Sequence, residues 1–126
     1  MDLMTRRRAL LAQQTEDTPT DLLANVEWIE GYFIDNIGNI AANAAGRITD
    51  YVKVRPNTTY ILQGHATGSP IYDRVHSYNA EKTWTNMIAR FDWMNQDFTS
   101  QFTTPSQCQY IRISTEIYTE IHMYLA

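Results

Sequence analysis

The 126-residue sequence has few cysteines, which stabilise small exported domains as disulfides, and no long apolar run of the kind that spans a membrane. It contains one cysteine, Cys108, so a disulfide bond within the chain is excluded. No apolar run approaches the roughly 20 residues that a membrane-spanning helix needs. The apolar stretch after Arg6-Arg7-Arg8 ends at Gln13, which makes it too short for a signal-peptide core. We therefore expect no export signal and no membrane partner, and a fold that depends on its core or its partners.

Basic residues are also few, and they are unevenly placed. The formal net charge is −4, yet residues 1–14 hold three arginines against one aspartate, so the rest of the chain is acidic. Nonspecific binding to nucleic acid needs a basic surface, so the main body is a poor candidate for that class. The arginine triplet is shorter than the basic runs of about five to eight residues that indicate nucleic-acid binding. Nucleic acid is therefore not an expected partner.

Spacings that indicate catalysis or metal binding are missing. His65, His76 and His122 are far apart in sequence, and no pair of histidines has a metal-ligand spacing. No glycine-rich phosphate loop occurs, and no carboxylate spacing indicates a general-acid pair. We expect a protein that is not an enzyme, with no cofactor and no metal.

What the sequence does have is aromatic and β-branched residues at a period of two. Aromatic residues make up 12% of the chain, which favours strands over helices. Turn residues divide residues 28–126 into short segments, with turns expected at 35–39, 56–57 and 79–82 and a loop at 43–46. The pattern predicts an all-β domain, an antiparallel β-sandwich or jelly roll of about eight or nine strands. Its strands are expected at 28–34, 48–54, 58–63, 72–78, 87–93, 98–103, 110–114 and 117–125.

Alternation along these strands also predicts the core. Ile111 and Ile113 should face the interior while Tyr110 and Arg112 face the other way, because side chains alternate along a strand. The expected core partners of the two isoleucines are Val52, Val54, Tyr60 and Leu62.

Residues 1–27 lack this alternation and are expected to form a partly helical N-terminal arm. Apolar and basic residues of the segment 3–11 fall on one helical stripe, and Thr18-Pro19 has the chemistry of a helix start, which predicts a second short helix over 19–25. Helices this short are marginal alone in water, so the arm needs a surface to dock on. The arginines could instead contact nucleic acid, or remain solvated. The residues we expect to dock on a partner are Leu3, Arg6, Arg7, Arg8, Leu10 and Leu11.

Five segments in a fixed order carry a resemblance to a known family: 30–40, 49–60, 75–84, 102–105 and 110–114. Together they resemble the small jelly-roll, carbohydrate-binding-module-like domains of structural proteins from tailed phages and prophages. The chain departs from that pattern at Cys108-Gln109, where the family often has alanine, and in the turn at 79–82. The resemblance covers about residues 28–116 and provides no sugar site to carry across.

The resemblance implies a non-catalytic virion component of the tail, baseplate or head. Other virion proteins would be its partners, and a symmetric homo-oligomer such as a trimer would be its assembled form.

Aromatic side chains near predicted loops support an alternative, a carbohydrate-binding module that recognises a host cell-surface glycan. Aromatic faces pack on the C–H surfaces of sugars, and neighbouring amides bind hydroxyl groups. The competing interpretation is that these aromatics are core or interface residues, where aromatics are also frequent. The candidate glycan-binding residues are Tyr72, Trp84, Asn86, Trp93 and Asn95.

Overall fold

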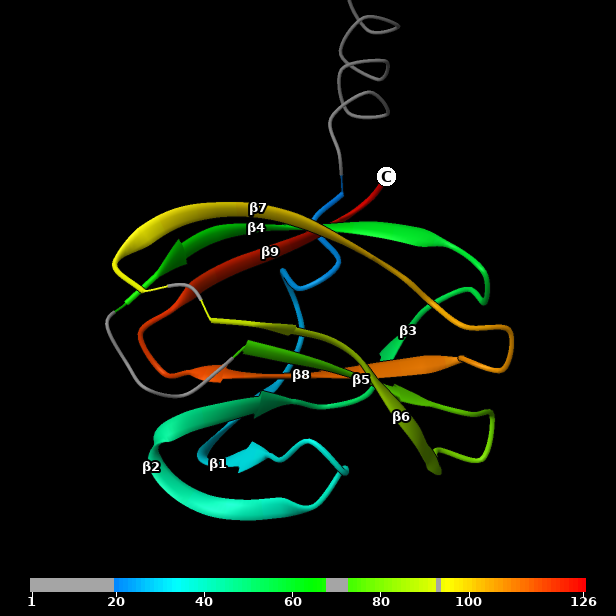
Figure 1. Cartoon of the computed structure of the whole chain (residues 1–126), viewed down its shortest axis with the longest axis horizontal. Coiled ribbons are helices and arrows are strands. Elements are labelled where there is room, and N and C mark those ends of the chain that lie inside the picture. The colour runs from blue at the N-terminus through cyan, green and yellow to red at the C-terminus, as the bar shows by residue number, and fades with distance from the viewer. Residues whose placement is uncertain (1–19, 68–72, 93) are drawn as a thin grey trace, which may run out of the picture.

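The computed structural model describes residues 20–67, 73–92 and 94–126, and this part of the chain forms a two-layer antiparallel β-sandwich (Figure 1). The all-β sandwich predicted from the sequence is therefore confirmed. The larger sheet contains β1 (Trp28–Ile34), β2 (Ile40–Thr49), β3 (Val52–Lys53), β5 (Asp73–Tyr78), β6 (Trp84–Phe91) and β8 (Tyr110–Glu116). The smaller sheet contains β4 (Thr59–Ala66), β7 (Gln96–Thr103) and β9 (Glu120–Leu125).

The chain passes repeatedly from one sheet to the other. The larger sheet has the order β1-β2-β8-β5-β6, with β3 also paired to β8, and the smaller sheet has the order β7-β4-β9. β1 pairs with β2, and among the described strands after β3 the only consecutive strands that pair are β5 and β6. Both sheets therefore depend on pairings between strands that are distant in sequence.

The core lies between the two sheets and contains the predicted residues. Ile111 and Ile113 of β8 are fully buried, and the four expected partners from β3, β4 and the link between them are also buried. Arg112 points to the other face, where its Nε donates to the Thr49 carbonyl. Tyr60 stacks on Phe102 of β7 with ring centroids 5.7 Å apart, which joins neighbouring strands of the smaller sheet inside the core.

The predicted turns form as expected. The Asp35 carboxylate accepts hydrogen bonds from the backbone N–H groups of Ile37 and Asn39. Asn79 accepts in the same way from the N–H groups two and four residues on. Asn57 has a φ of 53°, the left-handed conformation that asparagine tolerates.

Other predicted strand ends differ from the observed ones by one to three residues, and two parts of the strand pattern were predicted wrongly. The loop expected at 43–46 lies inside β2, because Gly46 pairs with Glu116 of β8 and Ala41 and Ala42, just before the segment, pair with β1. The single strand expected at 48–54 is divided into the end of β2 and β3. The N–H of Asp50 donates to the Glu27 carbonyl, which takes residues 50–51 out of the ladder with β8.

The short helix expected at 19–25 is also wrong, because residues 22–25 form turns and none of residues 20–25 is helical. Asp21 accepts hydrogen bonds from the N–H of Leu23 and from the N–H of Met123 on β9, each at 3.0 Å. Leu23 is buried in the core. The aspartate therefore attaches this segment to β9 instead of starting a helix. The rest of the predicted arm, with Leu3, Arg6, Arg7, Arg8, Leu10 and Leu11, lies outside the described residues.

Candidate functional site

The outer surface of the smaller sheet is polar. Gln63 pairs with Thr99 on one side and His122 on the other, and His65 pairs with Asp97 and Glu120. Directly paired residues point to the same face, and neighbours along a strand point to the opposite one. Since Leu62, Phe98 and Met123 point into the core, the other set points outward. We call this outward set, together with Tyr124, the polar face: Gln63, His65, Asp97, Thr99, Glu120, His122 and Tyr124.

A hollow of about 300 Å³ lies on the polar face and is lined by all seven of these residues. That volume is at the lower end of the range for small-molecule sites. The lining side chains come from all three strands of the sheet, so the fold itself holds them around one space.

One histidine of the polar face forms an exposed pair. The Nδ1 atom of His65 lies 2.8 Å from Oδ1 of Asp97, and the two side chains are 52% and 93% exposed. Exposed ion pairs contribute little to stability. The pair is therefore available for a ligand without a large effect on the fold.

The second histidine joins two acidic groups. Nδ1 of His122 lies 2.7 Å from Asp21, and Nε2 lies 2.9 Å from Glu120. These hydrogen bonds, with Asp21 first, raise the pKa of His122. Burial pushes the pKa of Asp21 upward, but its hydrogen bonds with His122, Met123 and Leu23 outweigh burial, so its pKa is lowered. The His122 imidazole thus bridges two carboxylates at the edge of the hollow.

The donor and acceptor set suits a neutral polyhydroxylated ligand. Two imidazoles, two carboxylates, an amide and two hydroxyl groups line the hollow, and the ring of Tyr124 stands next to His122 with centroids 6.5 Å apart. Among the residues that the structure describes, no three histidine, cysteine or acidic side chains converge to hold a metal ion. The arrangement supports hydrogen bonding to a ligand.

Trp84, a candidate sugar platform, belongs to the other sheet and is partly covered. Its Nε1 donates to Nδ1 of the fully buried His76 at 3.0 Å. A Cβ atom placed on Gly38 would lie 2.6–2.7 Å from Cγ, Cδ1 and Cδ2 of the indole. A point equally far from these three atoms lies above the five-membered ring, so the turn at 35–39 covers one face of Trp84.

The remaining glycan candidates are separate from the polar-face hollow. Asn86 is exposed on β6, and Asn95 is exposed in the turn before β7 with a φ of 50°. Neither residue lines the hollow, and Trp84 does not line it either. Tyr72 and Trp93 lie outside the described residues. The sequence analysis did not select the polar face. Its only sign in the sequence was the alternation of polar residues at 63–65 and 120–124.

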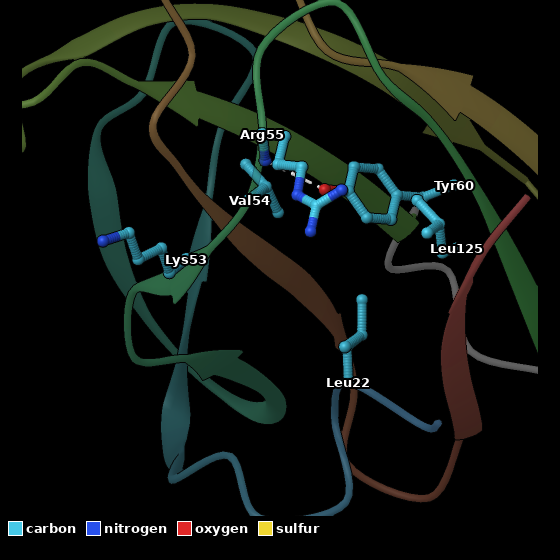
Figure 2. Close-up of a pocket in the computed structure, with 6 residues that line it drawn as sticks. All are labelled: Leu22, Lys53, Val54, Arg55, Tyr60 and Leu125. Carbon is cyan, nitrogen blue, oxygen red and sulfur yellow. Dashed lines mark hydrogen bonds between the residues drawn. The ribbon is translucent and has the colours of Figure 1, made fainter. Parts of the chain in front are cut away.

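A second hollow, of about 280 Å³, has a mainly apolar lining (Figure 2). The Tyr60 hydroxyl at its wall accepts a hydrogen bond from the N–H of Arg55 at 2.9 Å. The N–H of Leu22 donates to the Met123 carbonyl, which places the start of the described chain beside the end of β9. We call this space the apolar hollow; it is lined by Leu22, Lys53, Val54, Arg55, Tyr60 and Leu125.

No protein-family model matches the chain, and no curated protein matches it in sequence. Within the part of the chain that the structure describes, no helix is long and apolar enough to cross a membrane.

Proposed function

We propose that this chain is a non-catalytic structural protein of a tailed-phage particle. Its jelly-roll body is displayed on the particle, and residues 1–14 dock on neighbouring virion proteins. The observation that carries the proposal is where the family-like segments lie in the sandwich. Segment 49–60 contains β3 and the turn at Asn57, and segment 110–114 forms most of β8, which pairs with β2, β3 and β5.

The strand connections support the jelly-roll part of the proposal. Connections that alternate between two antiparallel sheets are typical of that architecture. From β3 to β5 and again from β6 to β9, each connection crosses from one sheet to the other.

Mass spectrometry of purified particles from the producing strain tests the proposal. We expect peptides of this chain in amounts comparable with those of known structural proteins, and resistant to washing in high salt. A chain found only in the lysate, or removed from particles by salt, would contradict a structural role.

A second function, binding of a cell-surface glycan, is favoured by the polar face. Its hollow presents hydrogen-bonding side chains from three strands beside an aromatic ring, which is the chemistry that recognises sugar hydroxyl and C–H groups. The two functions are compatible, since a displayed domain that binds a glycan would attach a particle to its host.

A glycan array with purified wild-type protein tests this second function. We expect the signal to fall at least about tenfold in the double variant His65→Ala and Asp97→Ala, the loss of two polar contacts of about 0.5–1.5 kcal/mol each. Gln101→Ala, on an exposed residue of β7 outside the hollow, is the matched control and should retain the signal. The double variant Trp84→Ala and Trp93→Ala distinguishes binding at the polar face from binding at the tryptophans that the sequence suggested. No wild-type signal, or equal signals from all variants, would count against glycan binding here.

A further inference from the structure

The apolar hollow exposes hydrophobic surface beside a described chain end. Leu125 is 53% exposed there, and it is one of the few large apolar side chains that are exposed in the described part of the chain. Figure 2 shows the side chain of Leu22 pointing from below towards Tyr60, Leu125 and the Arg55 guanidinium. An exposed apolar surface with a concave shape is suited to receive other apolar side chains.

The described part of the N-terminal arm lies at the wall of this hollow. Leu22 lines it, and Asp21 is fixed by Met123 and His122 of β9, so the described chain starts beside it. Leu10 and Leu11 lie only about eleven residues before Leu22. A connecting chain of this length spans up to about 35 Å, so it has ample length to turn back to its own hollow.

Charge favours the same arrangement. Lys53 and Arg55 are exposed at the rim and form no ion pair with any residue that the structure describes. Glu16 and Asp17 lie in the connecting chain, between the two leucines and the rim. Seating the leucines in the hollow would bring these acidic residues towards the two cations.

We propose that Leu10 and Leu11 seat in the apolar hollow of their own chain in the free protein. Attachment through a short linker gives the arm an effective concentration on the order of millimolar, which exceeds that of a second copy in dilute solution. This inference deepens the proposed function and rests on it for one step, the transfer of the same leucines to a neighbouring subunit during assembly. The hollow would then store the arm until a partner competes for it.

Disulfide trapping in the full chain tests the stored arm. The double variant Ala12→Cys and Ala126→Cys places one thiol beside the leucines and the other at the end of β9, and it leaves the lining intact. The native Cys108 is fully buried and does not compete. We expect oxidation to give a cross-linked monomer at a rate that about tenfold dilution does not change, since the reaction is intramolecular.

Matched variants make the trap specific. Ala12→Cys with Tyr118→Cys puts the second thiol on an exposed residue at the opposite end of β9 and should cross-link at least about tenfold more slowly. Adding Leu10→Asp and Leu11→Asp to the Ala12→Cys, Ala126→Cys variant should slow its cross-linking to the rate of the Tyr118→Cys control. Glu16→Lys should slow it more than Asp2→Lys, which makes the same charge change farther along the chain.

Each other outcome overturns a stated part of the inference. Cross-linked dimers whose yield falls on dilution would place a neighbour's arm in the hollow, and rates equal to the Tyr118 control would mean that the hollow stays empty of the arm. A trapped monomer that still enters particles as well as its reduced form would leave the stored arm standing and contradict docking by the leucines.

Discussion

At the scale of single residues, Gly38 contacts Trp84. The sequence predicts the turn that contains Gly38, but it does not predict this packing contact. The turn chemistry of Asp35-Asn36-Ile37-Gly38-Asn39 is local, so it can be recognised from the residues alone. The indole that lies over Gly38 comes from β6, about 46 residues further along the chain. The sequence therefore predicts the turn, whereas the packing partner of Trp84 depends on tertiary structure.

This contact leads to a stability prediction for Gly38→Ala. Gly38 has a φ of +86°, and an added Cβ would meet the indole at 2.6 Å. We expect the free energy of unfolding to fall by about 2–4 kcal/mol, combining strain in the left-handed region with overpacking. Urea denaturation followed by tryptophan fluorescence measures it.

Gly31→Ala is the matched control for this prediction. Gly31 has a φ of +93° but nothing within 4 Å of an added Cβ, so its variant carries the backbone strain alone. If the two variants lose the same stability, the contact between Gly38 and the indole contributes nothing.

At the scale of elements, the segment 20–27 shows where local patterns mislead. Thr18-Pro19-Thr20-Asp21 has the residues of a helix N-terminus, but the Asp21 carboxylate accepts from Met123 on β9 and pairs with His122. Similarly, Asn43 to Gly46 reads as a loop, yet pairing with β1 and β8 extends β2 through it. The strands rich in β-branched residues, such as β8, were predictable because propensity and pairing agree there.

The attachment of this segment to β9 should depend on pH. His122 has a pKa raised above 6.5, so its contribution to stability is fully present below pH 6.5 and is lost as the pH rises through the folded-state pKa. The lowered pKa of Asp21 works oppositely: its contribution is present above 3.8 and is lost as the pH falls through the lowered value. The pair is therefore strongest in mildly acidic solution.

We expect the wild-type protein to lose unfolding free energy as the pH rises above 6.5, and His122→Gln to lose less over the same interval. Burial raises the pKa of Asp73 to about 6, so most of its titration precedes this interval. His65→Gln, on the exposed pair of the polar face, is the control and should follow the wild type. Parallel pH profiles for wild type and His122→Gln would remove His122 from this role.

At the scale of the whole molecule, the sequence predicts the fold class and most of the core but not the order of the strands. Alternation identifies Ile111, Ile113 and Leu62 as interior residues, because period two is a property of each strand alone. Which strands pair is decided by long-range contacts, as when β8 meets β2, β3 and β5. The polar face could not be located for the same reason, since its residues come from three strands distant in sequence.

We propose that the chain has a body that folds by itself and an arm that attaches it to a particle. The most direct test compares the full chain with a chain that lacks residues 1–14, by circular dichroism and by the amount found in purified particles. We expect the truncated protein to keep the β-sheet spectrum and a cooperative thermal transition, and to be absent from particles that contain the full chain. A truncated protein that unfolds, or one that enters particles in undiminished amount, would contradict the account.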